Sequence, residues 1–109
     1  MILNRLIIPE YNDLNFILNH TENGEKYQLP GNCRYYIIIS KPTEPFEKLL
    51  FCTTENEYFS VPADIPEGEY IFEIGMINSN DARTVILPAL DERLRPLNQL
   101  LVLRRLSDE

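Results

Sequence analysis

The chain has 109 residues, of which 44% are hydrophobic and 25% are charged. These proportions are close to the average for globular domains, which excludes a disordered chain and indicates a single domain over residues 1–109. Seventeen acidic residues outnumber ten basic ones and give a formal charge of -7. Because this charge opposes binding to a phosphate backbone, nucleic acid is excluded as an expected partner.

The sequence shows no sign of export or of membrane insertion. The apolar run at residues 2–8 is too short for the core of a signal peptide, and no small-residue cleavage site follows it. No stretch approaches the roughly 18 apolar residues that span a bilayer. We therefore expect a protein made in the cytoplasm, with no signal peptide and no membrane partner. Its two cysteines, Cys33 and Cys52, lack the spacing of a zinc or redox motif and are expected to be reduced.

The first part of the chain has the pattern of short strands joined by turns. Residues 2–8 are rich in β-branched residues and leucine, and Pro9 suits an edge or a strand end because it cannot donate to a ladder. Residues 13–19 alternate apolar and polar side chains over most of their length, which predicts a second strand. The pair Asn23-Gly24 predicts a hairpin turn, since both residues tolerate positive φ.

Residues 33–41 form the most continuous apolar run, with large side chains on both parities. This pattern predicts a central strand covered on both faces, or a strand with one face against a partner. A turn cluster at residues 29–32 precedes it. Residues 46–53 return as the second strand of a hairpin.

The register of this hairpin decides whether the cysteines can meet. With Lys41 opposite Phe46, Tyr35 faces Cys52, and Cys33 lies one diagonal away from Cys52 on the same face. Diagonal Cβ atoms are about 7 Å apart or somewhat less, whereas a disulfide needs roughly 3.5 to 4.5 Å. A slip of two residues would permit the bond, so this geometry leaves both states open.

The clearest strand follows the turn at residues 66–68. Short strands are expected before and after it, at residues 58–61 and 84–87, with a hairpin tip at residues 78–81. One parity of the clearest strand is wholly large and apolar, which predicts a half-buried strand with these residues on the core: Tyr70, Phe72, Ile74 and Met76.

The spacing of these elements predicts the fold class. Strands and turns recur about every 8 to 12 residues, which is typical of an all-β sandwich, here with about 7–9 strands. Phe72 and Ile37 lie at the centres of the two most apolar strands. We expect both to be among the most buried residues.

The last part of the chain fits two structures. Leucines at positions 90, 94, 97 and 101 fall at helical intervals, but Pro96 inside that pattern removes a hydrogen-bond donor. We favour a loop at residues 88–99 and a terminal strand at residues 100–106 over a short helix. The apolar residues here are too many for a free tail, so we expect them to pack on the domain's own sheet or on a neighbouring subunit as a possible interaction segment: Leu97, Leu100, Leu101, Val102, Leu103 and Leu106.

The sequence offers few groups for catalysis or metal binding. His20 is the only histidine, which excludes a two-histidine metal site within one chain, and we expect it to be a solvated side chain in a polar loop. Acidic residues at positions 64, 67, 69 and 73 are expected to keep strand rims soluble rather than to form an acid/base pair. Residues 78–81 lack the glycine and glutamate of an EF-hand loop. We predict no metal, no cofactor and no enzymatic activity.

The tyrosines bear on a different class of function. Several exposed on one face could form a platform on which a sugar stacks. Most fall within predicted strands, so packing in the core or across strands is favoured for the six: Tyr11, Tyr27, Tyr35, Tyr36, Tyr58 and Tyr70.

Residues 66–70, Pro-Glu-Gly-Glu-Tyr, resemble the Pro-x-Gly-x-Tyr motif of immunoglobulin-like sandwiches, in which a tyrosine near the corner can hydrogen-bond back to the turn. Residues 11–87 are similar to the N-terminal β-sandwich of tailed-phage baseplate and tail proteins, through the strand at 14–18, the Asn-Gly and Leu-Pro-Gly turns and the strand at 34–41. The resemblance implies an antiparallel immunoglobulin-like sandwich. Its implied function is that of a non-enzymatic assembly module, with protein partners or self-association, incorporated in a virion. A carbohydrate-binding module is the alternative.

Overall fold

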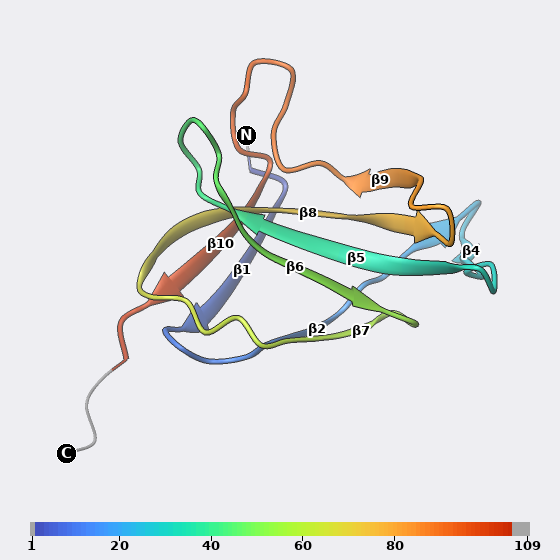
Figure 1. The fold of residues 1–109 in the computed structure, drawn as a ribbon, viewed down its shortest axis with the longest axis horizontal. Coiled ribbons are helices and arrows are strands. Elements are labelled where there is room, and N and C mark those ends of the chain that lie inside the picture. The colour runs from blue at the N-terminus through green and yellow to red at the C-terminus, as the bar shows by residue number, and fades with distance from the viewer. Residues whose placement is uncertain (1, 106–109) are drawn as a thin grey trace.

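A six-stranded sheet forms the larger layer of the fold in the computed structural model, which describes residues 2–105 (Figure 1). Five of its strands follow one another in the order β1 (Asn4–Pro9), β10 (Asn98–Leu103), β8 (Gly68–Asn78), β5 (Cys33–Ser40) and β6 (Lys48–Thr54). The sixth strand, β9 (Arg83–Leu87), pairs with the part of β8 that β10 leaves free. β1 and β10 run parallel, whereas every other pair of the sheet is antiparallel.

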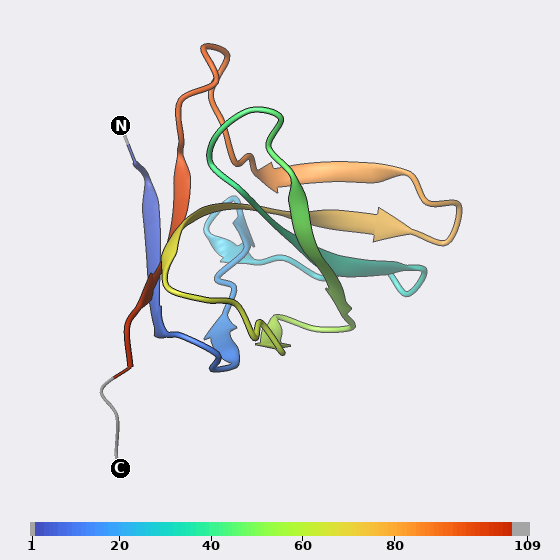
Figure 2. The ribbon, with the colours of Figure 1, turned by 60° about the vertical axis from the view of Figure 1, so that its left-hand side comes forward.

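The parallel pair corrects the expectation of an antiparallel sandwich. After β1 the chain crosses to a second layer before it returns to the large sheet (Figure 2). β1 and its neighbour β10 are therefore not joined by a hairpin. Six positions pair along β1 and β10, from Asn4 opposite Asn98 to Pro9 opposite Leu103. β1 lies at the edge of the sheet, as its proline predicts, and the sheet is mixed.

Two small sheets complete the fold. β2 (Leu14–Ile17) pairs with β7 (Tyr58–Val61) as a second layer over one face of the large sheet, and β3 (Thr21–Glu22) pairs with β4 (Glu25–Lys26). Within residues 2–105 these elements make ten strands and no helix, which confirms the all-β class. The described part of the chain accordingly has no helix that is long and apolar enough to cross a membrane.

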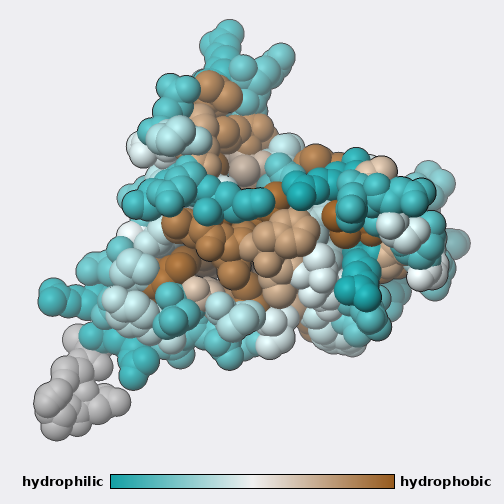
Figure 3. Space-filling model, viewed as in Figure 1, coloured by the Kyte–Doolittle hydropathy of each residue, from teal (hydrophilic) through white to brown (hydrophobic). Residues whose placement is uncertain are grey.

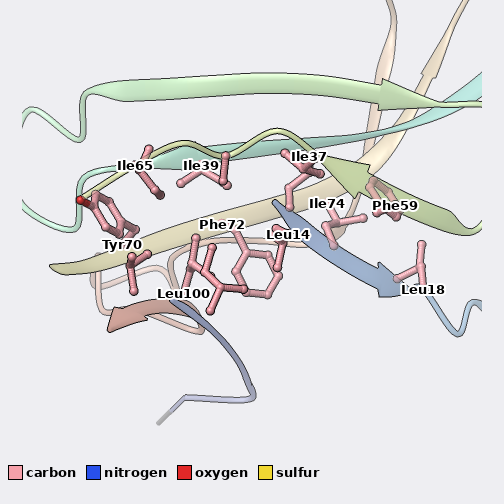
Figure 4. Packing of buried hydrophobic residues seen from close by; sticks show 14 of the residues in the cluster. Leu14, Leu18, Ile37, Ile39, Phe59, Ile65, Tyr70, Phe72, Ile74 and Leu100 are labelled. Atoms are coloured by element: carbon pink, nitrogen blue, oxygen red, sulfur yellow. The ribbon is translucent and has the colours of Figure 1, made fainter. Parts of the chain in front are cut away.

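The core lies between the two layers (Figure 4). Ile37 of β5 and Phe72 of β8 have relative exposures of 0% and 2%, so the prediction that both are among the most buried residues is confirmed. Their partners come from the second layer and from β10, and they include Leu14, Phe59, Val61, Leu100 and Val102. Period-two alternation thus places one side of each long strand in this core.

The opposite, outer face of the large sheet is covered by its own side chains. Tyr36 of β5 is 0% exposed. Its ring stacks on that of Phe51 with centroids 5.8 Å apart, the Arg83 guanidinium lies 5.4 Å from the Tyr36 centroid, and the Tyr36 hydroxyl donates to Glu73 at 2.7 Å. Gly75 is opposite Tyr36 on β8, and a Cβ there would come within 2.7 Å of the tyrosine ring. The glycine therefore leaves room for the ring to lie across β8.

The β5–β6 hairpin differs in register from the prediction. Cys52 is opposite Ile37 instead of Tyr35, a shift of two residues, and the register is irregular next to Ser40. The connection is longer than expected because Phe46 belongs to the turn, where its φ is 57°. The shift moves Cys52 farther along β5 from Cys33, and both cysteines are free in the structure.

The predicted turns agree with the structure. Asn23 and Gly24 have φ values of 55° and 82°, as the hairpin turn between β3 and β4 requires. At the start of β8 the Tyr70 hydroxyl donates to the Pro66 carbonyl at 2.8 Å. This bond ties the strand to the turn that precedes it.

The terminal strand is present but its bounds differ from those predicted. β10 spans Asn98–Leu103, whereas the sequence predicted a loop at residues 88–99 and a strand at residues 100–106. The strand begins two residues before the predicted start. It includes two polar side chains that are buried in the sheet, Asn98 and Gln99 (0% and 8% exposed). Leu106 lies outside the described residues.

Candidate interaction surfaces

The predicted interaction segment mostly completes the chain's own sheet. β10 lies between β1 and β8, so both of its edges are already paired. The described members of the segment are the buried Leu100 and Val102, the half-buried Leu97 and Leu101, and Leu103, which is 52% exposed. Packing on the domain's own sheet is therefore confirmed for Leu100 and Val102, and Leu103 is the most available to a partner. Leu106 lies beyond the described part of the chain.

Hydrogen-bonded amides fix β10 to its neighbours. Asn98 accepts a hydrogen bond from Nδ2 of Asn4 and donates one to the Pro88 carbonyl, both at 2.7 Å. Gln99 likewise accepts from Arg5 at 3.0 Å and donates to Glu69 at 3.1 Å. Buried amides without partners would cost about 1–3 kcal/mol each, so these bonds are what make the polar start of β10 possible. Sequence reasoning missed them because amides at strand ends usually indicate a loop.

One flank of the two-layered fold is open. Within residues 2–105 the outer edges of β6 and β7 pair with no other strand, and only a bond from the Thr54 hydroxyl to the Tyr58 carbonyl, at 3.0 Å, joins the two strands at one end. The apolar side chains of Leu49, Leu50 and Cys52 are only partly buried there. Figure 3 shows an apolar patch in the centre of the view, where β6 passes in front of the space between the layers. We call this surface the open flank.

A smaller cleft, the His20 cleft, lies beside the β3–β4 hairpin and has a volume of about 280 Å³. His20 is half-buried there, which corrects the expectation of a solvated side chain in a loop. Its ring stacks on Tyr27 with centroids 4.3 Å apart, and its Nδ1 lies 2.9 Å from the Tyr35 hydroxyl. The cleft is further lined by Ile17, Leu18, Asn19, Lys26, Glu57 and Tyr58.

The polar groups of the His20 cleft are held by their neighbours. Burial raises the pKa of the Tyr35 hydroxyl, and the nearby Tyr27 and Glu57 raise it further. Tyr35 therefore keeps its proton and can hold the imidazole of His20 in one orientation. The Glu57 side chain is 22% exposed and its carboxylate lies 3.1 Å from Lys26 Nζ. The arrangement could not be read from the sequence, because its members come from four separate segments.

A larger cleft of about 660 Å³ lies between residues 29–34, β6 and the β8–β9 turn. Its charged side chains include Arg34 and Glu55, which are 3.7 Å apart and largely exposed, so their pairing contributes little to stability. Among the described residues, no buried side-chain nitrogen or oxygen lacks a hydrogen-bond partner. Among the described residues this cleft therefore has no buried side-chain polar atom that lacks a hydrogen-bond partner.

Two of the four acidic positions and the oxygen-rich turn have structural roles. Glu73 and Glu69 accept hydrogen bonds from Tyr36 and Gln99, so neither is only a solubilising group. The Asn78 side chain accepts from the backbone N–H groups of two residues within its own turn, at 2.8 and 3.0 Å. No group of three or more His, Cys, Asp or Glu side chains in residues 2–105 could hold a metal ion.

The tyrosines divide into two groups. Tyr35, Tyr36 and Tyr70 are buried, as favoured from the sequence, and Tyr27 is half-buried. Tyr11 and Tyr58 are 57% and 59% exposed. The exposed pair lies on different segments, and only Tyr58 lines a cleft.

Comparisons with known proteins found no matching family model, no matching curated protein and no matching solved structure.

Proposed function

We propose that this chain is an immunoglobulin-like sandwich that serves as a non-enzymatic assembly module in a phage or prophage particle. The strand order supports the fold assignment, because in such a fold β5, β6, β8 and β10 would correspond to strands C, C′, F and G of one sheet, and β2 and β7 to strands B and E. The hydrogen bond from Tyr70 to Pro66 stands where such folds have their tyrosine corner. Phage baseplate and tail proteins use sandwiches of this kind, by the resemblance described above.

The open flank is the observation that carries the assembly function. An unpaired strand edge offers a row of backbone donors and acceptors, and most monomeric proteins protect such edges. Here two neighbouring edges, β6 and β7, border partly buried apolar side chains. A β-strand is the occupant whose chemistry fits both features, since its backbone can pair with β6 while alternate side chains enter between the layers.

The occupant we infer is an extended segment of another protein of the same particle. Burial of each large apolar side chain contributes roughly 1.5 to 3 kcal/mol, so a segment with two or three of them would bind stably. Paired with β6, such a segment would become the next strand of the large sheet, at the edge opposite β1.

The proposal can be tested by complex formation. Proteins encoded by neighbouring genes should include tail or capsid components, and one of them should co-elute with the chain in size-exclusion chromatography with light scattering. Leu50→Lys, in the open flank, should abolish the complex. Val85→Lys, at a 48% exposed position of β9, is the matched control and should retain it.

Three results would speak against this function. They are a complex that Leu50→Lys leaves intact, self-association in place of a second protein, and gene neighbours from polysaccharide utilisation. Circular dichroism of both variants establishes that the fold is preserved.

A further inference from the structure

We propose that the His20 cleft binds a single neutral pyranose ring of a glycan. The cleft volume of about 280 Å³ is just below the usual range of about 300 to 1,000 Å³ for ligand pockets, which suits one ring better than an extended chain. The inference does not rest on the assembly function, because it depends on different side chains and a different class of ligand.

The rim of the cleft supplies an aromatic surface. Tyr58 is 59% exposed at the start of β7, and the residue opposite it on β2, Ile17, is 65% exposed. A tyrosine side chain has only two rotatable torsions, so little conformational entropy is lost when a ligand covers its ring. A pyranose has one face of C–H groups that can pack against a tyrosine ring, while its hydroxyls remain free for polar contacts.

The floor supplies polar groups that are already oriented. Tyr35 holds the His20 ring through Nδ1 at 2.9 Å, so that Nε2 is left as the second hydrogen-bonding atom of the imidazole. Tyr27 stacks on the same ring with an interplanar angle of 29°. Sugar hydroxyls both donate and accept, and they can therefore use imidazole, amide and carboxylate groups together.

The charges of the cleft favour a neutral sugar. Glu57 and Lys26 are 3.1 Å apart and compensate each other, so the cleft holds no unpaired cation that would attract an acidic sugar. The formal charge of the whole chain, -7, opposes an anionic ligand as well. A carboxylate beside a paired ammonium still accepts hydrogen bonds from neighbouring hydroxyls of a neutral ring.

The single histidine makes a direct test possible. Because His20 is the only histidine, its ring signals in a ¹H–¹³C spectrum of the labelled full chain need no assignment by mutagenesis. The probes are glucose, galactose, mannose and N-acetylglucosamine, each titrated to about 100 mM, a range that detects millimolar dissociation constants. We expect saturable shifts of the His20 signals for at least one of them.

Two variants and one control locate the binding. Tyr58→Ala keeps the backbone N–H that bonds to the Asn56 side chain and should weaken binding by about tenfold or more. Glu57→Gln keeps the shape of the side chain and should weaken binding severalfold, so it covers the case in which Tyr58→Ala does not fold. Tyr11→Asn removes an equally exposed tyrosine elsewhere and should leave binding unchanged; asparagine suits the φ of 59° at that position.

The inference is overturned if none of the four sugars shifts the His20 signals saturably, or if Tyr58→Ala binds as tightly as the parent. It is also overturned if glucuronate binds more tightly than the neutral sugars, since the site would then select an anion. Failure of the assembly function would appear instead in chromatography with Leu50→Lys, so the two proposals fail separately.

Discussion

The two faces of the large sheet bury their side chains by different means. On the inner face, Ile37 and Phe72 are covered by the second layer and by β10, as in any two-layer domain. On the outer face no second layer lies over Tyr36, yet that residue is 0% exposed. Its cover is the ring of Phe51, the guanidinium of Arg83 and its own position flat across Gly75.

The difference shows that burial does not require a second layer of backbone. Tyr36 lies flat over a glycine on the neighbouring strand, and it is as fully buried there as a residue in the core between two layers. It also means that the outer face depends on a few specific contacts, whereas the inner face depends on shared packing. The following substitutions test this distinction, from the largest expected effect to the smallest.

Phe72→Ala should lower the free energy of unfolding by about 3–5 kcal/mol, because it removes a large side chain from the centre of the shared core. A chemical denaturation curve measures the loss. Phe51→Ala, on the outer face at 37% exposure, is the comparison and should cost clearly less. Equal losses would show that the two faces contribute equally.

Gly75→Ala should destabilise by about 1–3 kcal/mol, because the added Cβ overlaps the Thr84 carbonyl oxygen and the Tyr36 ring. Gly31→Ala is the matched control, since a Cβ there meets nothing within 4 Å. Thermal melting of both variants gives the comparison. A Gly75→Ala variant that melts like Gly31→Ala would mean that Tyr36 does not lie across β8.

Stability should fall as the pH rises above about 10. Burial first, and then the Glu73 carboxylate that accepts its hydrogen bond, raise the pKa of Tyr36 above its ordinary value of 10.0, and Arg83 opposes this. Burial likewise raises the pKa of Tyr35 and Tyr70. The folded state therefore holds these protons more tightly than the unfolded state, so the stability that they contribute is fully present below pH 10 and is lost as the pH rises towards the folded-state values.

Denaturation at about pH 8 to 11, together with absorbance of ionised tyrosine, measures this dependence, over a range that includes the ordinary tyrosine pKa of about 10. Tyr36→Phe should make stability fall less steeply with pH above about 10, because one of the three buried tyrosine hydroxyls is removed. An unchanged slope in that variant would place the alkaline sensitivity on the inner face alone.

Arg83→Ala should cost about 0.5–1 kcal/mol, the usual value of a cation–π contact at an exposed site. The guanidinium lies 5.4 Å from the Tyr36 centroid and 5.1 Å from the Phe51 centroid. Arg93→Ala is the control, because the bond from Arg93 to Asp91 uses the backbone N–H and survives the change. If the stability losses of the two variants agree within experimental error, Arg83 does not help to stabilise the buried Tyr36.

The sequence predicted the strands better than it predicted their partners. Alternation identified β8 and the double-sided apolar run identified β5, because both signals are local and follow from period two. The parallel neighbour of β1 could not be predicted, since that pairing joins residues 94 positions apart. The register of β5 and β6 was wrong because it depends on a turn conformation at Phe46 that no local propensity requires.

The candidate sites were harder to predict from the sequence than the strand pairing. Nothing in the neighbourhood of His20 in the sequence shows that Tyr35 and Tyr27 will hold its ring. The open flank is a property of the whole topology, since it depends on which strands end the two sheets. The predicted apolar segment at the end of the chain was a true signal of burial, but most of it serves the domain's own sheet.

The parallel pairing of β1 with β10 has a mechanical consequence. A pull on the Asn4 end of β1 and the Leu103 end of β10 acts along both strands in opposite directions, as Figure 1 shows. Such a load shears the six paired positions together, whereas a pull across a hairpin opens its bonds one after another. The domain should therefore resist extension between these two points far more strongly than it resists peeling of β9 from β8.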